Sequence, residues 1–307
     1  MGIKHFINSQ DFSRGEYDAI LKRAEEFVSA GIPPTLLEGK IAATLFFQPS
    51  TRTMSSFQSA LIRAGGGWIG VRGEKGLSME KGEDFDDTIR TYSDFSDVIV
   101  LRHPSETSAH DAARVSRVPV INGGSGTREH AVWAVMLLFN MYHYFNGKLD
   151  GKRVGIYGVT GVNRVCKALV PVLGYYGMSI AVDDLGHFPF SEEVVSSAKK
   201  KGLAQLSYNT LDDFISEVDY LLVPHALQTG IQSSDEVLKK QQEVISKKFK
   251  PITKEHMKKL RKDAFLDMVA PRMFEVERDV DSDPRAIFTK KAIHTHAAVA
   301  LVEHVLK

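Results

Sequence analysis

Short apolar runs alternate with helix-like patterns along the chain, and this alternation restricts the fold more than any other feature. In the first half, residues 40–47, 68–71, 98–102 and 118–121 are apolar runs of strand length. Helical spacing of apolar residues occupies 16–30, 56–64 and 85–95. Short apolar runs bounded by Gly, Pro or polar residues are typical of strands buried on both faces of a parallel sheet. The order predicts an α/β fold with a parallel sheet and helices on both faces.

A second series of the same kind begins after a polar, glycine-bearing stretch at residues 147–152. Its strand candidates are residues 153–157, 178–182 and 220–223. The 307 residues are enough for two domains of about 150 residues each. We therefore expect two doubly wound parallel-sheet domains, residues 1–147 and 148–307. The apolar run Ala131 to Tyr144 is too short to span a bilayer, which needs about 20 residues, so we interpret it as a buried helix.

Charge and cysteine content exclude several classes of function. Lys plus Arg number 39 and Asp plus Glu 38, a formal charge of +1, so no overall field would recruit nucleic acid or an anionic membrane. The single Cys166 cannot form an internal disulfide, and no segment has the pattern of a signal peptide. We expect a soluble cytoplasmic protein with no nucleic acid or membrane partner.

Ser50-Thr51-Arg52-Thr53 follows the first predicted strand and opens the next predicted helix. A helix start offers unpaired N–H groups and the positive end of the helix dipole, so an Arg and three hydroxyls there would suit a phosphate dianion. The alternative is a hydroxyl-capped helix that carries a surface Arg. The tetrapeptide alone does not decide between the two interpretations.

Residues 46–57, in which Phe46-Phe47 precedes Ser50-Thr51-Arg52-Thr53, resemble the signature of the aspartate and ornithine carbamoyltransferase family. That family binds the phosphate of carbamoyl phosphate with its Ser-Thr-Arg-Thr segment. The resemblance continues in order through Ser78-x-x-Lys81-Gly82-Glu83, Asp87–Arg90, Val100–Pro104, Asn122-x-Gly124-x-Gly126 and Asp279–Ala286. Residues 101–104 and 279–285 are more similar to the aspartate branch. The resemblance implies a carbamoyl-phosphate-binding first domain, an amino-acid-binding second domain, and a C-terminal helix at 288–307 that returns to the first.

The resemblance also assigns roles. The segment Ser50-Thr51-Arg52-Thr53 would bind phosphate, and Arg102 would bridge the phosphate and the carbonyl oxygen through its donor fork. His130 would polarise the carbonyl. Ser78 and Lys81 would reach the active site of a neighbouring subunit in a homotrimer. Each of these roles has a plainer alternative. Arg102 would form a surface ion pair, His130 would be a capping or core histidine, and Ser78 and Lys81 would lie in a solvated charged loop.

The residues expected to bind the amino acid match the family pattern less well than those expected to bind phosphate. Arg164 resembles the family Arg that holds the aspartate carboxylate, but His225 stands where the family has a second Arg, so His225 or Lys75 would have to supply that cation. The family also follows its His with Pro-Thr-Gln, and its Gln recognises the carbamoyl amino group. Here His130 is followed by Ala-Val-Trp133, and an indole has one donor and no acceptor.

The implied activity is carbamoyl transfer from carbamoyl phosphate to the amine of L-aspartate, giving N-carbamoyl-aspartate and phosphate for pyrimidine biosynthesis. No metal or organic cofactor is implied, and a regulatory chain is a possible partner. The departures at Trp133 and His225 leave two alternatives, a transferase with another amine acceptor and a non-catalytic homologue that binds phosphate.

A dinucleotide-dependent enzyme is a further alternative. Gly155, Gly158 and Gly161 follow a predicted strand, and Asp183 and Asp184 end the next one. The three-residue glycine spacing differs from the Gly-x-Gly-x-x-Gly fingerprint.

Elsewhere, His294 and His296 are only two residues apart, so on a helix they point to different sides and make a poor metal pair.

Overall fold

The computed structural model describes residues 2–73, 78–226 and 235–307. Their contacts form two compact units, a first unit of Met1–Asn140 with Ala292–Lys307 and a second unit of Met141–Lys291. Each unit contains a parallel sheet with helices, so the predicted fold class is confirmed. The contact boundary falls within helix α5 (Ala131–Tyr144), which is buried as predicted through its first eleven residues. The roles expected for residues 1–147 and 148–307 stay a prediction.

The first unit has a four-stranded sheet in the order β2-β1-β3-β4. Its strands are β1 Ile41–Phe46, β2 Gly67–Arg72, β3 Val98–His103 and β4 Val120–Ser125. Its helices are α1 Arg14–Ala30, α2 Arg52–Arg63, α3 Phe85–Phe95, α4 Ser108–Val115, the first part of α5, and α11 His294–Leu306, with a 3₁₀ turn at Ser78–Lys81. Because β2 and β3 lie on opposite sides of β1, the chain changes winding direction between β1 and β3. Ligands of open parallel sheets bind outside the carboxyl ends of the strands at such a point.

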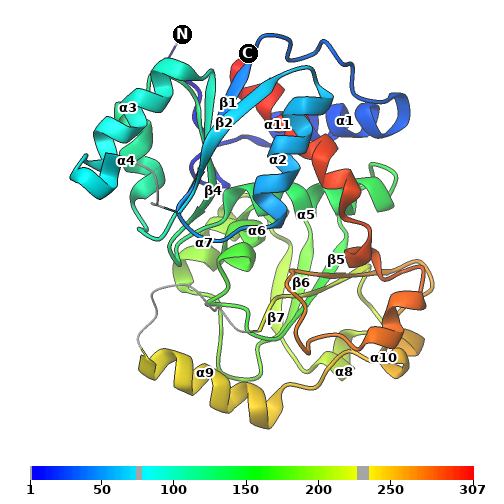
Figure 1. Cartoon of the computed structure of the whole chain (residues 1–307). Coiled ribbons are helices and arrows are strands. Elements are labelled where there is room, and N and C mark those ends of the chain that lie inside the picture. Colours follow the sequence, from blue (N-terminus) through cyan, green and yellow to red (C-terminus); the bar gives the residue numbers. More distant parts are fainter. Residues whose placement is uncertain (1, 74–77, 227–234) are drawn as a thin grey trace. The chain divides into compact units, whose positions relative to one another are not determined.

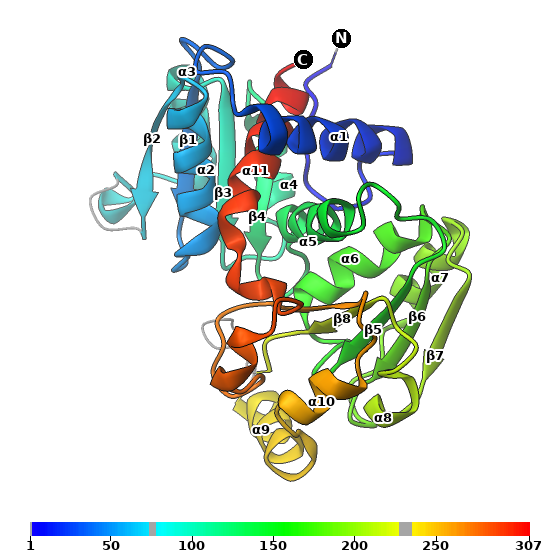
Figure 2. The same ribbon diagram turned by 90° about the vertical axis from the view of Figure 1, so that its right-hand side faces the viewer.

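Helices cover both faces of this sheet (Figure 1). On one face, Ile89 of α3 and Ala112 of α4 pack against strand residues such as Leu45 and Ile99. Helices α2 and α11 lie over the opposite face, where α11 also packs against α1 (Figure 2). Successive side chains of a strand point to opposite faces, which is why every residue from Ala42 to Phe46 is buried. The C-terminal helix therefore returns to the first unit, as expected.

The second unit has a five-stranded sheet in the order β7-β6-β5-β8-β9. Its strands are β5 Arg153–Tyr157, β6 Ser179–Asp183, β7 Gln205–Tyr208, β8 Tyr220–Val223 and β9 Phe265–Met268. Its helices are α6 Arg164–Gly174, α7 Glu192–Lys200, α8 Leu211–Phe214, α9 Asp235–Lys248 and α10 Lys254–Lys259, with 3₁₀ turns at Arg278–Ser282 and Ile287–Thr289; a third 3₁₀ turn, Lys291–Ile293, leads into α11. Helices α6 and α7 pack against each other. The winding direction of this sheet changes between β5 and β8.

Among the described residues, no helix combines the length and the apolar character needed to cross a membrane.

Candidate active site

The Ser50-Thr51-Arg52-Thr53 segment follows β1 and spans the start of α2, whose first two residues are Arg52 and Thr53, as the sequence predicts. Thr51 is the N-cap residue, but it has a helical backbone and its side chain makes no capping hydrogen bond. Thr51 itself is exposed and Ser50 is partly buried. The hydroxyl-capped helix of the alternative interpretation is therefore not what the structure contains. The start of α2 lies at the switch point of the first sheet, where an anion would meet the positive end of the helix dipole.

Two guanidinium groups lie at this switch point, and neither has an acidic partner among the described residues. Arg102, near the end of β3, is in register with Phe46 at the end of β1. Its Nε is buried and has no hydrogen-bond partner among the described residues. Burial and the nearby charge of Arg52 lower the pKa of Arg102 to about 10, and burial also lowers the pKa of Arg52. Two desolvated like charges that influence each other make a site that favours an anion.

Thr53 adds a hydroxyl to the two guanidinium groups. Its side chain is 4% exposed, and its Oγ1 accepts a hydrogen bond from the indole Nε1 of Trp133 at 3.3 Å. Within the described ranges, no acceptor is found for the hydroxyl proton of Thr53 itself. Arg52, Thr53 and Arg102 thus present donors and positive charge at one point, a combination that suits a phosphate.

His130 lies just before α5 and is 3% exposed. Its ring contacts Trp133 edge-on, with the ring centroids 6.2 Å apart. Trp133 in turn packs edge-on against His294 of α11, at 5.4 Å and an interplanar angle of 86°. Nε2 of His294 lies 3.0 Å from Oδ1 of Asn140. Trp133 therefore links His130 to Thr53, a connection that sequence reasoning missed because nothing in the local pattern relates α2 to α5.

Ser78 and Lys81 begin and end a short 3₁₀ turn, and both are exposed. Their expected place in the active site of a neighbouring subunit stays a prediction. Lys75, considered as a substitute cation, lies outside the described residues.

The two residues expected to bind the amino acid lie at the switch point of the second sheet. Arg164 is the first residue of α6 and is 6% exposed. Asn163 caps this helix, because its Oδ1 accepts hydrogen bonds from the amides of Val165 and Cys166. The Nδ2 of the same Asn163 side chain donates to the carbonyl oxygen of His225 at 3.3 Å. Asn163 thus joins the start of α6 to His225, the second residue after β8.

His225 has a buried acidic neighbour that the sequence did not indicate. Its Nδ1 lies 3.6 Å from Oε1 of Glu275, whose side chain is fully buried. Glu275 accepts backbone hydrogen bonds from Ala226 at 2.9 Å and Met273 at 2.7 Å. Burial opposes ionisation of Glu275, but His225 and these amides outweigh it and lower the pKa of Glu275 to about 2. A positive charge on His225 would face this carboxylate, so His225 is a weaker carboxylate anchor than a free Arg.

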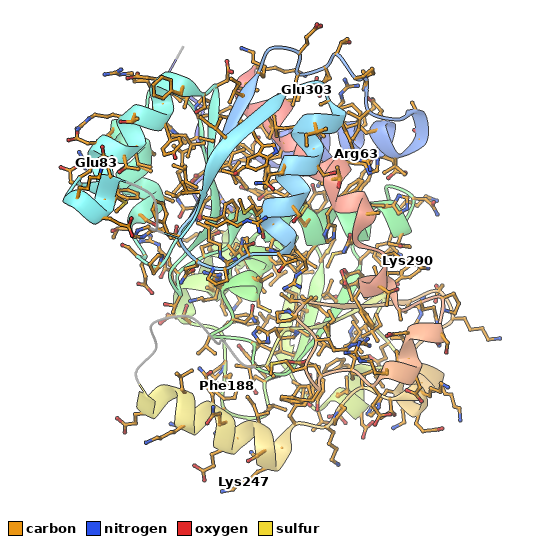
Figure 3. The ribbon with its side chains drawn as sticks, viewed as in Figure 1. Arg63, Glu83, Phe188, Lys247, Lys290 and Glu303 are labelled. Carbon is orange, nitrogen blue, oxygen red and sulfur yellow. The ribbon has the colours of Figure 1, made fainter. Side chains whose placement is uncertain are left out.

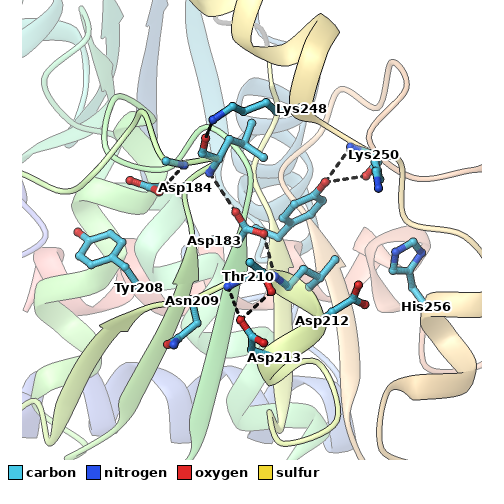
Figure 4. A pocket seen from close by; sticks show the side chains of 14 residues that line it. Asp183, Asp184, Tyr208, Asn209, Thr210, Asp212, Asp213, Lys248, Lys250 and His256 are labelled. Carbon is cyan, nitrogen blue, oxygen red and sulfur yellow. Dashed lines mark hydrogen bonds between the residues drawn. The ribbon is translucent and has the colours of Figure 1, made fainter.

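A cavity of about 810 Å³ lies in the second unit, outside the carboxyl ends of β5, β6 and β7 (Figure 4). The dinucleotide alternative would use Asp183 and Asp184 here. The two carboxylate oxygens of Asp183 accept the amides of Leu185 at 3.0 Å and Leu211 at 2.8 Å, and Asp184 accepts that of Gly186 at 2.8 Å. Asp183 and Asp184 thus accept backbone amides in the turn after β6, and Asp183 also accepts the first amide of α8, so these hydrogen bonds explain the two acidic residues without a ribose.

The glycines of the same alternative are explained by packing. The amide of Gly161 donates to the carbonyl of Phe188 at 2.8 Å, and Thr160 donates its hydroxyl to the same oxygen at 2.7 Å (Figure 3 labels Phe188). A Cβ on Gly161 would lie 1.9 Å from the carbonyl oxygen of Pro189, and one on Gly155 would lie 2.8 Å from Phe214. The amide of Gly161 is therefore not available to a pyrophosphate.

Comparison with known proteins agrees with the site in the first unit. Residues 4–143 match the family model of the aspartate/ornithine carbamoyltransferase carbamoyl-P binding domain. The chain is 33% identical to the aspartate carbamoyltransferase catalytic subunit of Thermococcus gammatolerans, over 93% of this chain and 91% of that one. The corresponding subunit of Methanocaldococcus jannaschii is 32% identical over 95% and 94%.

Solved structures give the same result. The aspartate transcarbamoylase of Trypanosoma cruzi, in complex with carbamoyl phosphate and aspartate, superposes with a TM-score of 0.90 at 26% identity, covering 99% of this chain and 97% of that one. The M. jannaschii catalytic subunit superposes at 0.85 with 30% identity, covering 99% and 98%. The chain belongs to the aspartate/ornithine carbamoyltransferase family. Within it, the two relatives named above, each matched over more than nine tenths of this chain, are aspartate carbamoyltransferase catalytic subunits.

Proposed function

We propose that the protein transfers the carbamoyl group of carbamoyl phosphate to the amine of L-aspartate, giving N-carbamoyl-aspartate and phosphate, as a step of pyrimidine biosynthesis in the cytoplasm. The observation that carries the proposal is the pair Arg52 and Arg102, two guanidinium groups at a sheet switch point that have no acidic partner among the described residues. The similar T. cruzi structure is described as a complex with both substrates of this reaction.

The phosphate end of the donor would be held by Arg52, Arg102 and Thr53. Arg102 carries a planar fork of donors, so it can bind a phosphate oxygen and the carbonyl oxygen together. His130 would donate to the same carbonyl oxygen. When the aspartate amine attacks the carbonyl carbon, negative charge develops on that oxygen, and donors fixed in advance lower the barrier. The intermediate then collapses, the bond from carbon to the phosphate oxygen breaks, and the departing phosphate takes up the proton that the attacking nitrogen loses.

The amino acid would be held through its carboxylates by Arg164, with His225 in a secondary role. We further propose a homotrimer, in which Ser78 and Lys81 of one subunit contribute to the active site of its neighbour. An exposed ammonium on a short turn is accessible to another chain, which is compatible with that role.

A transferase with a different amine acceptor is the second candidate. It is favoured by the pair formed by His225 and Glu275, because a buried carboxylate beside the imidazole disfavours a substrate carboxylate at the same place. Under this candidate the phosphate end of the reaction is unchanged and only the acceptor differs.

The test combines binding and turnover. Calorimetry with inorganic phosphate and carbamoyl phosphate should give saturable binding, and the assay should yield carbamoyl aspartate. Arg52→Ala should abolish phosphate binding, whereas Arg63→Ala, at an exposed position at the other end of α2, should retain it (Figure 3). Unchanged phosphate affinity in Arg52→Ala would show that the site is assigned wrongly. Phosphate binding with product from another amine supports the second candidate, and binding without turnover across amines refutes the enzymatic proposal.

A further inference from the structure

Trp133 directs its only polar atom at the phosphate-binding hydroxyl. The Trp133 side chain is 5% exposed, and its Nε1 lies 3.3 Å from Oγ1 of Thr53. An indole N–H can donate but not accept, so Thr53 is the acceptor in this hydrogen bond. A threonine hydroxyl that accepts on one side keeps its own proton for another partner. Among the residues that the structure describes, no protein acceptor takes that proton.

The indole packs against two histidine rings. The ring of His130 contacts it edge-on with the ring centroids 6.2 Å apart, and the ring of His294 of α11 contacts it edge-on at 5.4 Å. His294 is itself tied to α5 through its 3.0 Å contact with Asn140. Trp133 therefore packs against side chains that are each at least nine tenths buried. A ring packed in this way holds its N–H in one direction, as a mobile side chain would not.

We propose that Trp133 is a positioning residue of the phosphate site: its N–H occupies Oγ1 of Thr53 and so turns the Thr53 hydroxyl proton toward the bound phosphate. The inference rests on one part of the proposed function, the binding of a phosphate beside Arg52 and Arg102. It concerns only the phosphate end of carbamoyl phosphate. Because an indole offers no acceptor to an amino group, Trp133 should affect inorganic phosphate and carbamoyl phosphate by the same factor.

The test is a double-mutant cycle on the affinity for inorganic phosphate. Trp133→Phe keeps an aromatic ring and removes the N–H, and should weaken phosphate binding about three- to tenfold, the usual net effect of one hydrogen bond. Thr53→Val removes the hydroxyl itself. If Trp133 acts through Thr53, Trp133→Phe has no further effect in the Thr53→Val protein. Unchanged affinity in Trp133→Phe, or additive effects in the double variant, would overturn the proposal.

The second tryptophan provides the control. Trp68 of β2 is 40% exposed, and Trp68→Phe should leave phosphate affinity unchanged. That variant also leaves Trp133 as the sole tryptophan, since the chain has two, so its fluorescence reports on this site even if Trp133→Phe fails to fold. Phosphate should change the emission, and calorimetric binding without an emission change refutes the role of Trp133. An unaltered protein that binds no phosphate refutes the proposed function as well, whereas binding that is insensitive to Trp133→Phe refutes this inference alone.

Discussion

Replacing Arg102 by methionine should make the free protein more stable and at the same time destroy phosphate binding. Arg102 is a largely buried charge whose Nε has no hydrogen-bond partner among the described residues, and it lies close enough to Arg52 to be repelled by it. Methionine is similar in length, carries no charge, and adapts to irregular apolar surroundings. The change therefore removes the unfavourable charge and keeps most of the packing.

The size of the effect follows from the pKa. Burial and Arg52 lower the pKa of Arg102 to about 10, and at 1.36 kcal/mol per pH unit this corresponds to about 3 kcal/mol. At pH 7 the guanidinium is charged in both the folded and the unfolded chain, so the full penalty acts on the folded state and would fade only as the pH rises past about 10. Allowing for partial solvent screening and lost packing, we expect a gain of about 1–2 kcal/mol in the free energy of unfolding.

Urea unfolding at pH 7, with and without phosphate, measures both effects. Without phosphate, Arg102→Met should unfold at higher urea than the unaltered protein. A phosphate concentration of about 100 times Kd should stabilise the unaltered protein by about 2.7 kcal/mol and leave Arg102→Met nearly unaffected. Arg63→Met, at an exposed arginine of α2, is the control and should keep the phosphate effect. If Arg102→Met is the less stable protein without phosphate, the view of Arg102 as an uncompensated charge is wrong.

Three further predictions concern the second unit and α1. Glu275→Gln should lower stability at pH 7 by about 2–3 kcal/mol, because the folded-state pKa of about 2 stabilises the charged form; the difference from the unaltered protein should shrink between about pH 4.3 and 2 in urea titrations. Gly161→Ala should cost about 3 kcal/mol or more in thermal unfolding, since its Cβ would lie 1.9 Å from a carbonyl oxygen, whereas Gly15→Ala, with open space at a helix position, should be neutral or stabilising. Burial raises the pKa of the Cys166 thiol, so a thiol reagent at pH 8 should react only after denaturant is added; rapid labelling of the folded protein would contradict this.

Most strands could be predicted because they are continuous apolar runs, and β5 and β8 begin and end where expected. The short strands β7 and β9 were missed for different reasons. Strand β7 is a half-exposed edge strand without an apolar run. Strand β9 contains Asp267, a buried carboxylate that accepts a 2.6 Å hydrogen bond from the hydroxyl of Tyr220. Because its partner lies on another strand, the sequence around Asp267 does not show that this polar residue is buried, and β9 does not read as an apolar run.

Strand β4 shows how a distant segment can override local pattern. The sequence predicts a strand at 118–121, whereas β4 runs from Val120 to Ser125 through two glycines. The N-terminal segment explains the shift, because the backbone of Phe6 donates to the carbonyl of Val120 and accepts from the amide of Asn122, each at 2.8 Å. Nδ2 of Asn122 also donates to the carbonyl of Ile7 at 2.7 Å. These contacts lie more than a hundred residues away in sequence.

The candidate site was predictable to a similar extent. Arg52 and Thr53 were indicated by the hydroxyl-rich start of a predicted helix, and Arg102 by the family resemblance. The topology explains why they lie near one another, since residues at the carboxyl ends of adjacent parallel strands meet at one edge. The sequence did not indicate the surroundings of each group, namely the lack of a hydrogen-bond partner for Nε of Arg102 among the described residues, the hydrogen bond from Trp133, and the acid beside His225. Partners of this kind come from elements far apart in the chain, so no local spacing indicates them.

The uncompensated charge of Arg102 also indicates that the protein keeps a group for ligand binding. A chain that needed only the fold would be more stable with an apolar residue at the end of β3, because a buried charge without a partner opposes folding. Binding sites, by contrast, keep groups that cost stability in the free protein and are satisfied by the ligand. Two features of the first unit are unfavourable in the free protein: two guanidinium groups that repel each other, and a Thr53 hydroxyl proton with no acceptor among the described residues. One bound phosphate would relieve both. In the second unit, His225 already faces an internal carboxylate. Phosphate binding is therefore the property that the structure supports most directly, and the acceptor assay is the experiment that decides the reaction.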